Sequence, residues 1–150
     1  MSKLIVVDAN LLRDAFKDPD TCKDAEPDDV KAAFRIVASA LECKISFAYC
    51  KKMFTELSSG GFRSDGLLRP LFDNNKFVVE KKREISGGNY RDLTNYVNGD
   101  DAMYVLVAAN IPSKTLISRD PKTSSERSIR YIKRKLGVTV LRAAEFELPT

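Results

Sequence analysis

Acidic residues stand at the ends of two apolar runs in this chain, which contains no histidine. Asp8 follows the run at 4–7, and Asp120 comes shortly after the run at 115–118. If the two runs form neighbouring parallel strands, about 4.8 Å apart, both carboxylates face one small volume outside the carboxyl ends of the sheet. Open α/β sheets bind their ligands at such an edge.

Further acids add to this pair. Asp101, next to Asp100, opens the apolar segment at 102–109 and is expected to reach the same volume from the side. Glu56 lies in an expected helix at 50–59. Clustered carboxylates raise one another's pKa unless a cation neutralises them, and ligation by oxygen alone favours Mg²⁺ or Mn²⁺ over zinc. We therefore expect a divalent metal ion that activates water for phosphodiester hydrolysis.

Each of these acids also has an ordinary structural explanation. An aspartate at a strand end is a common turn former, which fits Asp8 and also Asp120, the residue before a proline. An acid at a helix start caps it or is favoured by the helix dipole, which fits Asp100 and Asp101. A helical glutamate such as Glu56 is usually solvated. Taken singly, the residues leave both interpretations open.

Short apolar runs alternate with segments of helical period, which predicts an α/β fold, a three-layer α/β/α sandwich around a mostly parallel sheet. The expected strands are 3–7, 44–48, 76–80, 114–118 and 138–141. The expected helices are 27–42, 50–59, 62–72 with a break near Pro70, 100–110 and 124–136. Residues 17–29 are expected to be an exposed acidic connection and residues 86–91 a loop.

The apolar patterns of three expected helices say how they pack. The segment 100–110 is apolar all round, which predicts a central buried helix. In the helix at 27–42 one face is expected to carry Val30, Phe34, Val37 and Leu41. In the helix at 124–136 one face carries Ile129, Ile132 and Leu136, and another carries Arg127, Arg130 and Arg134. One side of this last helix is therefore expected to pack and the other to present guanidinium groups.

The charge is unevenly distributed along the chain. Residues 114–142 hold nine basic and two acidic residues, whereas the rest of the chain has a net charge of −3. This asymmetry suggests a polyanionic partner on the C-terminal side, although a solvated helix face explains it equally well.

Length and composition indicate the class of protein. With 150 residues, 43% of them hydrophobic, the chain is expected to form a single domain spanning 1–150. Its three cysteines show neither a disulfide framework nor a metal-ligand pattern, which favours a reducing, intracellular setting. No apolar stretch reaches the length of about 18 residues that a transmembrane helix needs, and no signal-peptide pattern is present. We expect a soluble, cytoplasmic protein.

In their order along the chain, these residues resemble the PIN-domain nucleases, over nearly the whole chain. That family opens with a strand ending in Asp-x-Asn and then apolar residues, and residues 8–12, Asp-Ala-Asn-Leu-Leu, are similar. Its later signature is an Asp-Ala pair that opens an alanine-rich helix, followed by a strand ending in Ser-Arg-Asp. Residues 101–102 and 118–120 look like the two parts of this signature.

The resemblance implies a PIN-like fold, an acidic metal cluster and a hydrolase that cuts RNA. The cluster it implies is Asp8, Glu56, Asp101 and Asp120, with Asn10, Asp100 and Ser118 as supporting or capping groups. It also implies the toxin of a toxin–antitoxin pair, a homodimer inhibited by an antitoxin protein. From charge and spacing alone, the side chains expected to steer RNA phosphates are Arg119, Arg127, Arg130 and Arg134.

Two other functions remain open at this point. The first is a catalytically inactive PIN-like module that binds RNA or protein through its basic helix. The second is a phosphatase or response-regulator-like domain, which also places an aspartate after its first strand. The motif at 8–10 lacks the second aspartate of the phosphatase pattern, and residues 46–48 contain no phosphoacceptor aspartate. The metal-dependent ribonuclease is therefore the leading hypothesis.

Overall fold

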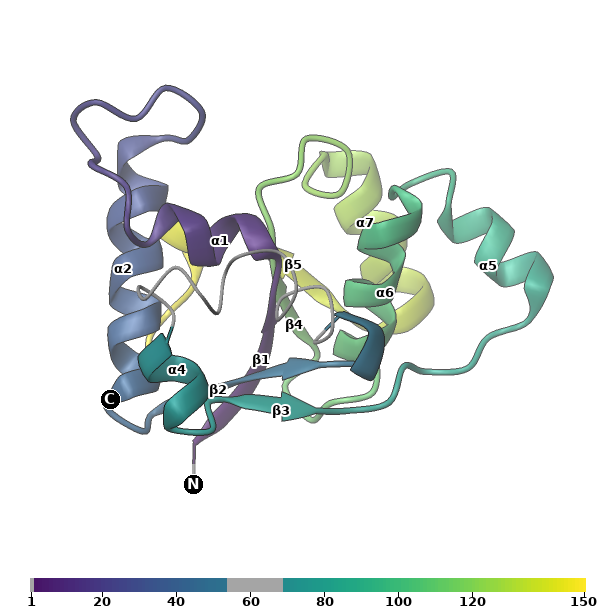
Figure 1. The fold of residues 1–150 in the computed structure, drawn as a ribbon. Helices are drawn as coiled ribbons and strands as arrows, with labels where there is room; N and C mark the ends of the chain where they lie inside the picture. Colours follow the sequence, from purple (N-terminus) through teal and green to yellow (C-terminus); the bar gives the residue numbers. More distant parts are fainter. Residues whose placement is uncertain (1, 54–68) are drawn as a thin grey trace.

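The fold is built on a five-stranded sheet in which every pair of neighbouring strands is parallel (Figure 1). It is seen in a computed structural model that describes residues 2–53 and 69–150. The strands are β1 (Lys3–Val7), β2 (Ile45–Tyr49), β3 (Phe77–Val79), β4 (Thr115–Ile117) and β5 (Thr139–Leu141), in the order β3-β2-β1-β4-β5. Each expected strand is confirmed to within one residue at either end.

Helices cover both faces of the sheet, which gives the three-layer α/β/α arrangement expected from the sequence (Figure 1). One outer layer consists of α1 (Ala9–Asp14), α2 (Pro27–Leu41) and α4 (Arg69–Asp73). The other contains α5 (Gly87–Leu93), α6 (Gly99–Ala108) and α7 (Glu126–Leu136). A short 3₁₀ helix, η1 (Ala143–Glu145), packs against α2. None of the helices described is long and apolar enough to cross a membrane.

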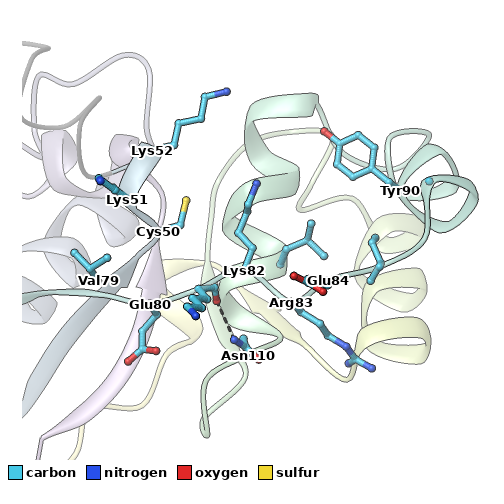
Figure 2. Close-up of a pocket in the computed structure, with 14 residues that line it drawn as sticks. Cys50, Lys51, Lys52, Val79, Glu80, Lys82, Arg83, Glu84, Tyr90 and Asn110 are labelled. Carbon is cyan, nitrogen blue, oxygen red and sulfur yellow. Dashed lines mark hydrogen bonds between the residues drawn. The ribbon is translucent and has the colours of Figure 1, made fainter.

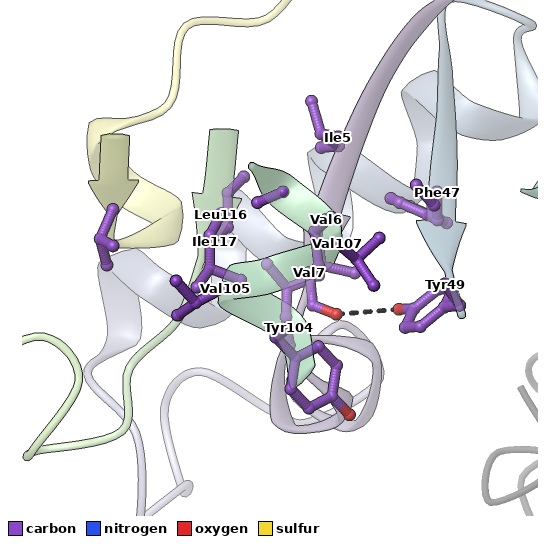
Figure 3. Packing of buried hydrophobic residues seen from close by; sticks show 14 of the residues in the cluster. Ile5, Val6, Val7, Phe47, Tyr49, Tyr104, Val105, Val107, Leu116 and Ile117 are labelled. Atoms are coloured by element: carbon purple, nitrogen blue, oxygen red, sulfur yellow. Dashed lines mark hydrogen bonds between the residues drawn. The ribbon is translucent and has the colours of Figure 1, made fainter. Parts of the chain in front are cut away.

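Helix α6 is the central buried helix that the sequence predicts. Every residue from Ala102 to Ala108 is buried, and the helix packs against β1, β2 and β4. Figure 3 shows Val105 and Val107 of α6 among the apolar side chains of β1 and β4. Because the core holds α6 on most sides, the first turn of the helix has a fixed position at the carboxyl edge of the sheet.

The face on which α2 packs differs from the expected one. Phe34 and Leu41 are 58% and 43% exposed. The residues that α2 buries at helical spacing are Val30, Ala33, Ile36, Val37 and Ala40. Alanines at this contact leave room for close approach of the helix, so the buried stripe includes small residues that an apolar pattern of large side chains does not single out.

The expected loop at 86–91 is wrong, because helix α5 begins at Gly87. Ser86 caps this helix by accepting a hydrogen bond from the Asn89 N–H at 3.1 Å. Leu93, which is 1% exposed, anchors its other end in the core. The cap and the apolar anchor together outweigh the low helix propensity of the two glycines in the first turn.

The acidic connection at 17–29 is exposed only in part. Residues 17–26 form turns and bends, but Pro27 begins α2, and Asp29 is only 4% exposed. The Asp29 carboxylate accepts hydrogen bonds from the Arg142 side chain and from the Ala144 N–H. Asp29 therefore fastens the start of α2 to η1.

Helix α7 packs as the sequence predicts. Ile132 and Leu136 are buried, and Ile129 is half-buried against the core. Ser125 caps the start of the helix, and Gly137, with φ of 71°, ends it in the left-handed conformation that favours glycine. Arg127, Arg130 and Arg134 are exposed, on the side of α7 that does not pack against the core.

Candidate metal centre

The strand order reverses between β1 and β4, and Asp8 and Ser118 stand just beyond the ends of these strands. Val7 pairs with Ile117 in the sheet, so the next residue of each strand lies at the same carboxyl edge. The Asp8 N–H donates to the Ile117 carbonyl at 3.0 Å, which continues the pairing for one further step. This is the place where parallel α/β sheets form ligand sites.

Asp8 is both a helix cap and a buried acid. Its Oδ1 accepts a hydrogen bond from the Leu11 N–H at 3.1 Å, and its Oδ2 accepts one from the Ser118 hydroxyl at 2.9 Å. Only 4% of the residue is exposed. Burial raises the pKa of Asp8, and the hydrogen bonds from Ser118 and Leu11 oppose that rise. Asp8 therefore has a structural role, although as the N-cap of α1 and not as a turn former, and its buried carboxylate lies at the edge of the sheet.

Asp120 lies in the turn that follows β4. Its Oδ2 accepts hydrogen bonds from the N–H groups of Lys122 at 3.1 Å and Thr123 at 3.0 Å. Its own N–H donates to the Ser118 hydroxyl oxygen at 3.2 Å. The turn expected from the Asp-Pro pair is present, and it holds the half-buried Asp120 carboxylate beside the end of β4.

Asp101 enters the same volume from the first turn of α6. Burial, and then the negative charges of Asp120 and Asp8, raise its pKa to about 6. The Thr123 hydroxyl donates a long hydrogen bond of 3.4 Å to Asp101 Oδ2. Asp100, one residue earlier, is exposed and adds to the rise in the pKa of Asp101. The charges of Asp120 and Asp8 therefore reach Asp101.

Two buried residues, Ser118 and Thr123, join the three acids into one chain of contacts. The Ser118 hydroxyl donates to the Asp8 carboxylate and accepts the Asp120 N–H. Thr123 donates its N–H to the Asp120 carboxylate and its hydroxyl to the Asp101 carboxylate. Ser118 is 3% and Thr123 0% exposed. The sequence does not single out Thr123, although its position three residues after an aspartate is the spacing of a side-chain-capped turn. These contacts fix the acids relative to one another before any ligand binds.

Tyr49 fixes the end of β1 from the neighbouring strand. Its hydroxyl, fully buried, donates to the Val7 carbonyl at 2.9 Å (Figure 3). Burial raises the pKa of Tyr49 well above its ordinary value, and the charge of Asp8 adds to the rise. The hydroxyl therefore keeps its proton and donates the hydrogen bond. Asn10 is half-buried in the first turn of α1, and the expected site residue Glu56 lies outside the described residues.

Arg119 lies between two site residues, but its guanidinium pairs with a buried acid. Its Nε donates to Asp14 Oδ2 at 2.6 Å and its Nη2 to Asp14 Oδ1 at 3.2 Å. Lys17 adds an ion pair with Asp14 at 2.8 Å. Asp14 is 2% exposed. It follows the buried Leu11 by three residues in α1, and this spacing places it on the inward face of the helix. Arg119 thus ties α1 to the end of β4 and is separate from the arginine side of α7.

The other three arginines lie together on α7, beside two stacked tyrosines. The Tyr96 and Tyr131 rings are 3.9 Å apart and nearly parallel, and the Arg127 guanidinium lies 4.6 Å from the Tyr96 ring centre. Arg134 lies 5.9 Å from the Tyr131 ring centre, and Arg130 pairs with Glu126. With Glu126, these five side chains line an open hollow of about 470 Å³. We call it the α7 hollow.

The acids fit a hard divalent cation by their chemistry. They supply carboxylate oxygens, with no histidine anywhere in the chain. Within residues 2–53 and 69–150, no three or more Asp, Glu, His or Cys side chains are arranged so that together they could hold a metal ion. Mg²⁺ does not require such an arrangement, because it commonly binds through one or two carboxylates and keeps several waters. The donor set therefore suits Mg²⁺ or Mn²⁺ better than an ion that needs a complete protein cage.

Comparison with protein-family models, with curated proteins and with solved structures finds no match. The site must be interpreted from its own geometry.

Proposed function

We propose that this chain is a metal-dependent endoribonuclease that hydrolyses phosphodiester bonds in RNA. The observation that carries the proposal is the chain of hydrogen bonds that joins Asp8, Asp120 and Asp101 through Ser118 and Thr123 at the point where the strand order reverses. Burial and the charges of Asp120 and Asp8 raise the pKa of Asp101 to about 6, well above that of an isolated aspartate. A bound divalent cation would relieve this repulsion, and acids with perturbed pKa values are common at catalytic centres.

In this proposal, Mg²⁺ or Mn²⁺ binds through one or two of the carboxylates of Asp8, Asp101 and Asp120 and keeps several waters. When bound, the ion would lower the pKa of a water molecule and stabilise charge on a phosphate. Ser118 orients the Asp8 carboxylate through its 2.9 Å hydrogen bond. Thr123 and the turn at 120–123 orient Asp120, and the buried helix α6 positions Asp101. Asn10 and Asp100 are supporting residues, and Glu56 is an additional expected ligand outside the described residues.

The basic side chains beside the centre support RNA as the substrate. The N-terminal end of α7 lies next to the turn at 120–123, because the Ser124 hydroxyl donates to the Asp120 carbonyl at 2.6 Å. Arg127 and Arg130 lie in the first turns of this helix, on its exposed side. Phosphate contacts supply much of the affinity in nucleic-acid binding, so these arginines suit an RNA backbone that enters the acidic centre.

A toxin of a toxin–antitoxin pair is the biological setting that we propose. In this setting the protein is a cytoplasmic homodimer, and an antitoxin protein inhibits it by placing a basic side chain among Asp8, Asp101 and Asp120. The test is whether a short reading frame adjoins its gene and, if so, co-expression with it. Restored growth of cells that otherwise stop growing supports this role, and unchanged growth arrest contradicts it.

The cleavage chemistry can be tested by the ends of the RNA products. If a bound cation activates water as the nucleophile, the 2′-hydroxyl takes no part in the reaction, and cleavage should leave no 2′,3′-cyclic phosphate. Substrates with 2′-O-methyl groups should still be cut. Mass spectrometry of products from a mixed set of RNAs, with Mn²⁺ and with EDTA, gives the answer. Cyclic phosphate ends, or cleavage that continues in EDTA, would contradict the proposal. A folded protein that binds RNA without cutting any would favour the inactive binding module.

A further inference from the structure

A second basic region lies at the β2–β3 half of the sheet. It is an open hollow of about 1220 Å³ between the segments that follow β2 and β3, helix α5 and the end of α6 (Figure 2). We call it the β3 groove. Five basic side chains line it against two acidic ones: Lys51, Lys52, Lys81, Lys82 and Arg83 against Glu80 and Glu84. The groove is therefore a place where negative charge accumulates from solution.

The β3 groove starts at the same edge of the sheet as the acidic centre. Cys50 directly follows β2, and Glu80 directly follows β3, at the carboxyl ends of these parallel strands. The Glu80 N–H donates to the Tyr49 carbonyl at 2.8 Å, and the Tyr49 hydroxyl donates to the carbonyl of Val7, the residue before Asp8. A short series of hydrogen bonds thus connects the wall of the groove to the end of β1.

The basic wall of the groove is held in place by main-chain contacts. The Arg83 N–H donates to the Leu106 carbonyl at 2.9 Å. The Asn110 side chain donates to the Lys81 carbonyl at 3.0 Å, as the dashed line in Figure 2 shows. Both partners belong to α6 or to the turn after it, so the extended segment at 80–85 is fastened to the most buried helix of the fold. The lysines are therefore presented from a fixed backbone.

The groove also offers apolar and aromatic surface. Tyr90, on α5, is 40% exposed, and Val79 is 55% exposed. Figure 2 shows Tyr90 on the opposite wall from Lys52, with Lys82 between them. A positively charged groove with an exposed aromatic ring is the combination by which proteins hold single-stranded nucleic acid, because the cations follow the backbone and the ring stacks on a base. A duplex offers no unstacked base to such a ring.

We propose that the β3 groove binds single-stranded RNA on one side of the bond that is cut at the acidic centre. This inference deepens the proposed function and rests on it for the choice of RNA. The strand runs from the acids at the end of β1, across the ends of β2 and β3, with phosphates beside Lys52 and Lys82 and a base against Tyr90. The α7 hollow lies on the other side of the acids, at the β4 half of the edge.

The test measures binding without cleavage, using a labelled single-stranded oligouridylate in EDTA. Lys52→Ala/Lys82→Ala should make the slope of log K against log salt concentration less negative by about 1.4, from about 0.7 per phosphate contact. The matched control is Lys31→Ala/Arg35→Ala, which removes the same charge from exposed positions on α2 and should leave the slope unchanged. Equal slopes in the two double variants, or no binding by the unmodified protein, would overturn the inference.

The proposed stacking of a base on Tyr90 is tested with separate variants. Tyr90→Ala should weaken oligouridylate binding about tenfold, whereas Tyr90→Phe, which keeps the ring, should bind as the unmodified protein does. Equal loss in both, or none in either, contradicts stacking at this position. If polyglutamate competes as well as unlabelled oligouridylate of equal charge, the groove accepts acidic protein and the RNA assignment is overturned.

These experiments can contradict RNA binding in the β3 groove and RNA cleavage at the acidic centre independently of each other. Binding that depends on Lys52 and Lys82 in a protein that cuts no RNA supports the groove and contradicts the nuclease. Cleavage by a protein whose slope is unchanged in Lys52→Ala/Lys82→Ala contradicts the groove alone.

Discussion

The Ser118 hydroxyl, at the end of β4, donates a hydrogen bond to Asp8 Oδ2, at the end of β1, with an oxygen–oxygen distance of 2.9 Å. The same hydroxyl oxygen accepts the N–H of Asp120 at 3.2 Å. One buried side chain therefore sets the positions of two acids that lie more than a hundred residues apart in the sequence. The candidate centre is held in place by neutral hydroxyl and main-chain N–H groups.

Replacement of Ser118 tests this arrangement. Ser118→Ala should lower the free energy of unfolding by about 1–3 kcal/mol, because Asp8 loses a buried hydrogen-bond donor. It should also raise the pKa of Asp8 further, since the Ser118 hydrogen bond lowers that pKa. Urea denaturation and carbonyl ¹³C NMR titration measure the two effects. Ser118→Thr, which keeps the hydroxyl, is the control, and an unchanged Asp8 pKa in Ser118→Ala would refute the role.

The raised pKa of Asp101 gives the pH dependence of stability a definite sign. A carboxyl whose pKa rises from 3.8 to about 6 on folding binds its proton more tightly in the folded state. Its contribution to stability is complete below pH 4 and is lost as the pH rises through about 6. Asp101→Asn should therefore be more stable than the unmodified protein at pH 7.5, by about 1–2 kcal/mol after allowance for partial exposure. The two proteins should converge near pH 4.

Thermal and urea denaturation in EDTA at both pH values measure this difference. Asp100→Asn is the matched control, because the neighbouring Asp100 is exposed and should change stability little at either pH. Equal stability of Asp101→Asn and the unmodified protein at pH 7.5 would show that the three acids are not electrostatically coupled.

Arg119 is expected to act on stability rather than on RNA binding. Arg119→Ala leaves the buried Asp14 carboxylate with Lys17 as its remaining ion-pair partner and should cost about 2–4 kcal/mol in unfolding free energy. The double variant Asp14→Ala/Arg119→Ala should lose less than the sum of the single losses, because neither charge is then left unpaired. Arg35→Ala on the exposed side of α2 is the control. A fully stable Arg119→Ala with reduced RNA affinity would instead return Arg119 to the phosphate-binding set.

The arginines of α7 should show the opposite behaviour. Arg127→Ala/Arg130→Ala should change stability little, since both side chains are exposed, and should flatten the salt dependence of RNA affinity by about 1.4 in slope. Fluorescence anisotropy with oligouridylate in EDTA measures the slope. Adding Arg134→Ala should flatten it further if all three arginines contact phosphates. An unchanged slope in the triple variant would rule out this side of α7 as an RNA contact.

Much of the fold is predictable because each strand is a short apolar run, and β4 and most of β1 and β2 are buried. The same rule predicts α6, whose side chains are apolar all round. Helices α1 and α5 escape prediction because they are short and depend on caps, Asp8 and Ser86, whose residue types are equally common in loops. Phe34 was misplaced because the apolar pattern of α2 contains two candidate stripes, and only packing against the sheet selects the one with alanines.

The candidate site is predictable as far as its acids mark strand ends and helix starts. Asp8, Asp101 and Asp120 could be expected together once β1 and β4 were taken as neighbours. Thr123 and the Asp14–Arg119 pair could not, because each depends on a contact between distant segments that no local pattern encodes. Arginine is a residue type that often binds phosphate, but the Arg119 guanidinium is bonded to the buried Asp14 carboxylate.

The central claim is that Asp8, Asp101 and Asp120 form a metal-dependent centre that cuts RNA, and the most direct test compares Asp8→Asn with Asp28→Asn. Asn at position 8 can still accept the Leu11 N–H bond that caps α1, and Asp28 is an exposed aspartate in the first turn of α2. Cleavage of a mixed set of RNAs with Mn²⁺ or Mg²⁺ is measured for both variants, the unmodified protein and an EDTA control. We predict that Asp28→Asn cuts at the normal rate, that Asp8→Asn is slower by at least about a hundredfold, and that EDTA abolishes cleavage. Equal cleavage by the two folded variants would contradict the account.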